Sequence, residues 1–380
     1  MHLKKISLTL ILSALSMAVV FAQKAKTVVP QSEMERVYEE VKTPYKYGLV
    51  LMPSNNSKKT DCPTVFRKGN KWYMTYLVFD GRGYETWLAE SKDLLNWEHK
   101  GTIMSFSKDT TLWDAHQKAG YLALQDYKWG GNYKLNKYDG KYWMSYFGGN
   151  SPGYEQGPLS IGLAYTKQDP SKVHEWQRLP KPVLTPNDPD VGWWENRNKL
   201  FKSTVIRDKD KKTGYPFVMY YNAVGDSLEN NLKTRWYERI GMAVSDDMVT
   251  WKRIMKDPVV HHPMGITGDP VIQQIGDLYV MFYFGAFWKD RKGAFNRFAC
   301  SYDLVNWTDW TGENLIESSE PYDEQYAHKS FVVKHKGVVY HFYNAVNKKE
   351  QRGIAVATSK DMGKSKLTFN AEPESEAIRE

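Results

Sequence analysis

The stretch Asp61-CPTVFRKGNKWYMTY-Leu77, followed by the hairpin Ser91-KDLLN-Trp97, is the first of five similar units in this 380-residue chain. Each unit joins a short apolar strand to an aromatic-rich strand through a polar turn, and most end in a Ser-x-Asp-x-x-x-Trp hairpin. The later units span residues 132–147, 199–222, 268–284 and 328–344, with hairpins or hairpin-like ends near Trp176, Trp251, Trp307 and Ser359. One four-stranded sheet cannot bury both faces until neighbours stack on it, so this repeat predicts an all-β, five-bladed β-propeller.

The repeated Asp and Trp of these hairpins are interpreted as structural. An Asp at this place can accept hydrogen bonds from neighbouring backbone N–H groups and so form the turn, while the Trp packs between blades. Catalytic groups are therefore sought elsewhere in the repeat.

The two ends of the chain differ from the repeat. Residues 1–22 combine a basic start, an apolar run and a small-residue cleavage pattern, which predicts a signal peptide and a periplasmic or secreted protein. Residues 23–365 are expected to form one propeller domain. The lead segment should contribute a short helix near residues 32–39 and a strand that pairs with the last unit. Residues 366–380 are polar and are expected to be a disordered tail.

Charge and cysteine content narrow the function classes. The formal charge of +8 comes from Lys and Arg scattered among nearly as many acids, which argues against a nucleic-acid partner. No stretch after the signal reaches the roughly 18 apolar residues of a membrane helix, so no membrane partner is expected. Cys62 and Cys300 lie in units that are not neighbours and lack the spacing of a metal motif, so two buried thiols are predicted.

Candidate site residues follow from the position of the inner strands. The first strand of every blade lines the central channel, so polar residues there converge although they are distant in sequence. Asp61, Asp269 and His328 lie within one residue of the same inner-strand position, and Glu195 lies a few residues ahead of it in the third unit. A buried strand gains nothing from a carboxylate unless the group is used or neutralised. The alternative is that Asp61 and Asp269 cap turns before proline and that His328 is a core residue.

Aromatic residues between the units suggest a sugar ligand. Six Trp residues lie outside the hairpin positions and would form stacking walls or fill gaps between blades: Trp113, Trp129, Trp193, Trp194, Trp236 and Trp288. The clusters at residues 113–117 and 193–198 join such rings to polar groups. We therefore predict that Trp113, Asp114, Trp194, Arg197 and His328 bind the substrate.

These features resemble the five-bladed β-propeller glycoside hydrolases of families 43, 62, 32, 68, 117 and 130, and most nearly the family 43-like members. The resemblance covers residues 58–360 and implies that Asp61 is a general base and Glu195 a general acid. The expected acid of the second blade has no match in register, so Asp114 or Asp269 would modulate the pKa of the general acid. His328 matches a channel histidine. No cofactor would be required, with a structural calcium ion in the channel as an option.

Departures from the family pattern select the reaction. The first unit lacks the Asn-Asp-Pro-Asn-like motif of the fructan-cleaving retaining branch, and the chain lacks a cluster of Arg and His that could hold phosphate. Hydrolysis with inversion is therefore predicted, by an exported, exo-acting enzyme that cleaves oligosaccharides or polysaccharide fragments from plants or algae. The alternative is a propeller that binds carbohydrate without cleaving it.

Overall fold

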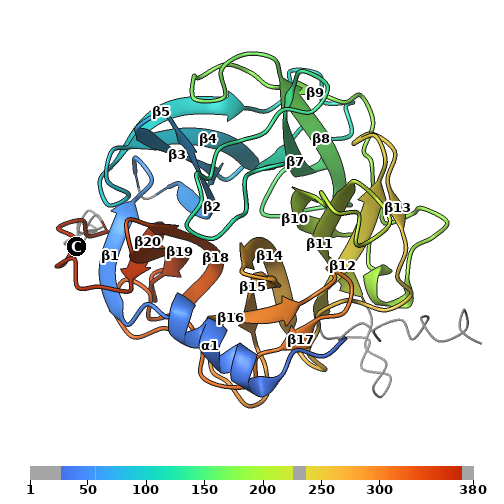
Figure 1. The fold of residues 1–380 in the computed structure, drawn as a ribbon. Helices are drawn as coiled ribbons and strands as arrows, with labels where there is room; N and C mark the ends of the chain where they lie inside the picture. Colours follow the sequence, from blue (N-terminus) through green and yellow to red (C-terminus); the bar gives the residue numbers. More distant parts are fainter. Residues whose placement is uncertain (1–26, 56, 226–236, 370–380) are drawn as a thin grey trace, which may run out of the picture.

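The computed structural model describes residues 27–55, 57–225 and 237–369. The predicted signal peptide, Trp236 and residues 370–380 of the predicted tail lie outside the described residues. Within the described part the chain forms twenty β-strands, one α-helix and one short 3-10 helix, which confirms the predicted all-β fold. The strands are arranged around a centre, with β2, β10, β14 and β18 innermost (Figure 1).

Each repeat forms a four-stranded antiparallel array. In chain order the arrays are β2 (Lys59–Lys68), β3 (Lys71–Phe79), β4 (Tyr84–Ser91) and β5 (Trp97–Met104); β6 (Gln117–Leu122), β7 (Tyr142–Gly149), β8 (Ser160–Thr166) and β9 (Gln177–Arg178); β10 (Leu200–Arg207), β11 (Phe217–Gly225), β12 (Tyr237–Ser245) and β13 (Lys252–Arg253); β14 (Ile266–Ile275), β15 (Leu278–Ala286), β16 (Ala294–Ser301) and β17 (Thr308–Asp309); and β18 (Tyr326–His335), β19 (Val338–Val346) and β20 (Arg352–Thr358) with β1 (Tyr45–Leu51). A single parallel pair, Glu238 with Ile266, joins the β10–β13 and β14–β17 arrays into one sheet. Counted by hydrogen bonding, the described arrays therefore form four sheets.

The lead segment closes the last array, as predicted. Strand β1 pairs antiparallel with β20, from Tyr45 opposite Thr358 to Leu51 opposite Ile354. Helix α1 (Gln31–Val41) precedes it and buries Met34, Val37 and Val41 on one face. Chain segments from opposite ends of the domain thus share one sheet.

Burial explains why the second strand of each array is so apolar. All nine residues of β11, β15 and β19 are buried, because neighbouring arrays cover both faces of these strands. The hairpin prediction is also confirmed: Asp93 Oδ1 accepts the N–H groups of Leu95 (3.0 Å) and Asn96 (2.8 Å), and Trp97 Nε1 donates to the Leu94 carbonyl (3.0 Å). The same acceptor geometry recurs at Asp247 and Asp303.

The second repeat corrects one expectation. Its inner strand is β6, whereas alignment on the aromatic strands places it at Gly131–Asn132. Residues 123–141 leave the sheet between β6 and β7 and cross to the fourth array, where Tyr127 and Trp129 exchange backbone hydrogen bonds with Gln274 (2.7 and 2.9 Å). This inserted segment is as aromatic as a strand, so composition could not separate the two.

Two smaller expectations also have outcomes. Cys62 and Cys300 are both free and buried, as predicted. In the described ranges, no helix is long and apolar enough to cross a membrane.

Candidate active site

A pocket of about 400 Å³ opens where the inner strands converge. Aromatic and apolar side chains form much of its wall, and the polar side chains that line it include Tyr84, Tyr154, Glu155, Lys202, Asn222, Glu238, Asp269, His328, Lys329, Glu350 and Arg352. Pockets of this size, largely apolar with a few convergent polar groups, are typical of small-molecule sites.

Repeated β-bulges aim polar side chains at this pocket. The register of the inner strands shifts between Asp61 and Thr64, between Gly268 and Val271, and between His328 and Phe331. The second residue of each bulge has a left-handed backbone: φ is 46° at Cys62, 57° at Asp269 and 62° at Lys329. Non-glycine residues adopt this conformation only where the surrounding structure enforces it, and bulges of this kind re-aim side chains near active sites.

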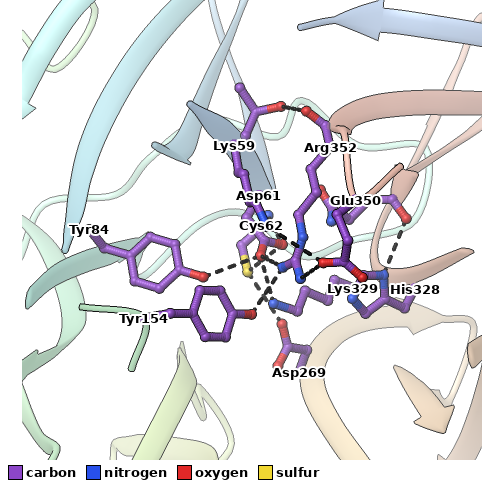
Figure 2. A network of polar contacts seen from close by, with 12 residues as sticks. Lys59, Asp61, Cys62, Tyr84, Tyr154, Asp269, His328, Lys329, Glu350 and Arg352 are labelled. Atoms are coloured by element: carbon purple, nitrogen blue, oxygen red, sulfur yellow. Dashed lines mark hydrogen bonds and ion pairs between the residues drawn. The ribbon is translucent and has the colours of Figure 1, made fainter. Parts of the chain in front are cut away.

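Asp61 is the centre of a buried ion cluster. Its Oδ2 lies 2.9 Å from Lys329 Nζ and 3.4 Å from Arg352 Nη1, and its Oδ1 accepts the N–H of Cys62 (2.9 Å) (Figure 2). Burial opposes ionisation, yet the charges of Lys329 and Arg352 hold the pKa of this carboxyl well below its usual range. Asp61 is therefore ionised and already paired.

The Cys62 thiol bridges two carboxyl groups. Its Sγ lies 3.5 Å from Asp61 Oδ1 and 3.5 Å from Asp269 Oδ2 (Figure 2). Burial raises the pKa of this thiol, so it stays protonated and donates rather than acting as a nucleophile. Burial also raises the pKa of Asp269, against the opposing charges of Lys202 and Lys329.

Two glutamates that the sequence analysis missed line the same pocket. Glu155 is half-buried in the loop between β7 and β8, with a left-handed backbone (φ 50°). Burial raises the pKa of its carboxyl, and the negative charge of Asp61 adds to this rise against the charge of Lys329. Glu238 is 8% exposed on β12, and its Oε2 accepts a hydrogen bond from Asn222 Nδ2 (2.8 Å).

An arginine and a tyrosine connect the ion cluster to the rim. Arg352 Nη1 donates to Tyr154 Oη (3.0 Å), and the guanidinium lies 5.1 Å from the centre of the Tyr154 ring. Arg352 Nη2 is 3.8 Å from Glu350 Oε2, whose side chain is more than half exposed. These contacts tie the loop carrying Tyr154 and Glu155 to the last array.

Comparison with known proteins identifies the class of this site. No protein-family model and no curated protein matches the sequence. A solved structure described as a glycoside hydrolase is 54% identical, with the match covering 91% of this chain and all of that one, at a TM-score of 0.86. The chain belongs to the glycoside hydrolases.

A second structure, described as a complex of BT0996 with RGII, is 55% identical over 91% of this chain and all of that one, with a TM-score of 0.87. A thermostable family-43 enzyme (17% identity, TM-score 0.56, 85% of this chain and 98% of that one) shares the fold. So does a family 117 enzyme from Zobellia galactanivorans (14%, TM-score 0.57, 84% and 91%). The predicted resemblance to propeller-type glycoside hydrolases is thus confirmed, and with it glycosidase activity.

The glycoside hydrolase keeps His328 at the pocket wall. This side chain is 8% exposed, and its Nδ1 lies 3.3 Å from the Asn344 carbonyl oxygen. Its ring packs edge-on against Phe284 at 5.3 Å. Burial lowers the pKa of His328 to about 3, so it is neutral at physiological pH.

Glu195 lies apart from the pocket lining of the glycoside hydrolase. It ends the 3-10 helix η1 (Trp193–Glu195), is 1% exposed, and accepts a hydrogen bond from Tyr221 Oη (2.9 Å). Arg253 Nε lies 2.9 Å from its Oε1, and the same guanidinium also binds Asp188 and Asp190. Burial raises the pKa of Glu195, but its carboxylate serves this arginine cluster in the structure.

The other predicted binding residues also lie outside the pocket lining. Asp114 is fully buried and holds Arg178 and the Tyr146 hydroxyl (2.7 Å), while Trp113 stacks on Tyr146 at 5.6 Å. Trp194 is buried against Tyr221 in the third array. Arg197 is exposed.

Tyrosine and phenylalanine, rather than tryptophan, supply the aromatic wall. Among the described residues no Trp lines the pocket, whereas Tyr84, Tyr121, Phe147, Tyr154, Phe201, Phe284, Phe287 and Tyr326 do. Three of the remaining candidates hydrogen-bond elsewhere: Trp129 to Glu40, Trp193 to Asp257 and Trp288 to the Ile266 carbonyl.

The arrangement of potential metal ligands bears on the calcium expectation. Over the described ranges, no group of three or more His, Cys, Asp or Glu side chains is placed to hold a metal ion. The channel calcium stays a prediction.

Proposed function

We propose that this glycoside hydrolase is an exo-acting enzyme that hydrolyses the terminal sugar of a plant polysaccharide fragment with inversion. The observation that carries the proposal is the pocket that Glu155, Glu238 and Asp269 line together. Three carboxyl groups around one aromatic-walled pocket provide a proton donor, a proton acceptor and a charge that adjusts them.

The shape of the site supports exo action. The pocket volume of about 400 Å³ accommodates a short end of a sugar chain. Beneath it the channel narrows to a cavity of about 20 Å³, so a polysaccharide cannot thread through. A substrate would therefore enter by its end.

We assign the general acid to Glu155 and the general base to Glu238. Glu155 has a carboxyl whose pKa is raised, which keeps a proton available for the glycosidic oxygen. Glu238 faces the same pocket from another array and would take the proton of the attacking water. Asp61, in contrast, is held by two cations, and we propose that it orients Lys329 and Arg352. Asp269 would modulate the pKa of the acid.

The substrate class is proposed from a relative. The 55% identical structure is a complex with RGII, so we propose that this enzyme acts on RGII or a fragment of it. The position of the aromatic wall, built from Tyr and Phe side chains, is consistent with stacking against sugar rings.

Three further expectations belong to this proposal. The five antiparallel arrays would act as five propeller blades, although one parallel pair joins two of them. Residues 23–365 would form a single domain. The N-terminal residues 1–22 would direct export to the periplasm or the outside of the cell.

The test compares Glu155→Gln and Glu238→Gln with the control Glu98→Gln, whose side chain is 74% exposed. Incubated with RGII oligosaccharides, the wild type should release one monosaccharide, whose first-formed anomer is read by proton NMR. We expect kcat to fall about 10²- to 10⁴-fold in the two pocket variants and to stay unchanged in the control. Activity within tenfold of wild type in both pocket variants would refute the assignment, and release of internal fragments would refute exo action.

A further inference from the structure

A buried lysine without a partner lies at the floor of the pocket. Lys202, on the inner strand β10, is 1% exposed. Among the described residues its Nζ has no hydrogen-bond partner and no carboxylate at ion-pair distance. The Tyr121 ring lies beside it, with its centre 5.5 Å from Nζ. An ammonium taken out of water without a counter-charge costs several kcal/mol, so something is expected to compensate it.

Two buried hydroxyl groups beside Lys202 also lack partners. Tyr121 is 2% and Thr64 is 4% exposed, and neither Tyr121 Oη nor Thr64 Oγ1 has a hydrogen-bond partner in the described part of the chain. All three side chains line one small cavity in the channel. Three unsatisfied donors from three different arrays therefore meet at one place.

The cavity has the size of one small ion. It leaves about 20 Å³ for the centre of a water-sized particle, while about 10–15 Å³ is enough to hold one. A sugar ring cannot enter such a space. Lys202 and Tyr121 also line the pocket above, so a particle can reach the cavity from there.

The other polar side chains of the cavity have their donors in use. The Gln125 amide donates to the Tyr133 carbonyl (3.0 Å), and the Thr204 hydroxyl donates to the Pro270 carbonyl. Much of the remaining lining is apolar, including Val205 and Ile206. The cavity thus presents a positive charge and hydroxyl donors without a carboxylate.

We propose that this cavity binds one small monovalent anion, a halide such as chloride, between Lys202 Nζ, Tyr121 Oη and Thr64 Oγ1. A single water accepts two hydrogen bonds and leaves the ammonium without a counter-charge. A halide accepts from all three donors and neutralises Lys202. This inference is independent of the proposed substrate and of the carboxylate assignments.

The first test is thermal unfolding at constant ionic strength, with sodium gluconate replaced stepwise by chloride or bromide. Binding to the folded state alone raises Tm, so we expect a rise of about 2 °C once the halide exceeds its dissociation constant tenfold. Lys202→Met should abolish this rise. The control Lys209→Met removes an exposed lysine and should keep it.

The second test is anomalous scattering from crystals of the wild type grown in bromide. A bromide peak beside Lys202 Nζ is expected, and it should be lost in Thr64→Val or Lys202→Met. If Lys202→Met does not fold, the wild-type crystals and Thr64→Val still decide the question. A cavity that scatters as water, or a halide-dependent Tm that is the same in Lys202→Met, would overturn the proposal.

Discussion

Replacing Lys329 with Met tests whether the ion cluster around Asp61 is organised as the structure indicates. Lys329 Nζ lies 2.9 Å from Asp61 Oδ2, and the two side chains are 11% and 1% exposed. Removing one partner of a buried pair leaves an uncompensated charge and costs about 3–5 kcal/mol. Arg352 Nη1 remains 3.4 Å from the same oxygen, so we expect a loss at the low end, about 3 kcal/mol.

The assay is guanidinium unfolding at several pH values. Asp61 has a folded-state pKa far below its unfolded value, so its contribution is full above about pH 4 and is lost as pH falls toward the folded pKa. The stability difference between wild type and Lys329→Met should therefore shrink from pH 5 to pH 2. As a control, Lys348→Met removes a pair whose lysine is 73% exposed and should cost under about 1 kcal/mol. A loss below about 1 kcal/mol for Lys329→Met, or a loss that does not change with pH, would refute this account.

Three further outcomes are expected. Asp93→Ala should lower the free energy of unfolding by about 1–2 kcal/mol, measured in urea, because two backbone N–H groups lose their acceptor. His328→Asn should flatten the loss of stability between pH 6.5 and 4. The folded pKa of His328 is lowered to about 3, so protons favour the unfolded chain below pH 6.5, by up to about 1.4 kcal/mol per pH unit. Phe287→Ala removes a 56% exposed ring of the pocket wall and should raise KM about fivefold while Tm stays constant.

Much of the fold was predictable because its signals are local. The Asp and Trp of Ser91-KDLLN-Trp97 form their turn with residues two to four positions away, so spacing alone identified the hairpins. The burial of strands such as β15 follows from composition. The pairing of β1 with β20 was predictable because an array with three strands of its own leaves an edge to be covered.

The site was only partly predictable because it depends on which loops reach the channel. Asp269 and His328 were identified from the inner-strand rule, and the structure places both at the pocket. Glu155 lies in a loop and Glu238 on a third strand, positions that the rule does not consider. Glu195 had the expected residue type and order, but Arg253, distant in sequence, holds it outside the pocket lining.

The sequence by itself determined the repeat, the all-β class and the resemblance to propeller glycosidases, since these depend on residue type and spacing along the chain. Only the tertiary structure decided which charges are paired. Asp61 meets Lys329 across 268 positions of sequence, while Lys202 meets no counter-charge among the described residues. Ionisation and hydrogen bonding depend on distance and burial in space, and bulges that turn Cys62, Asp269 and Lys329 into left-handed conformations set both.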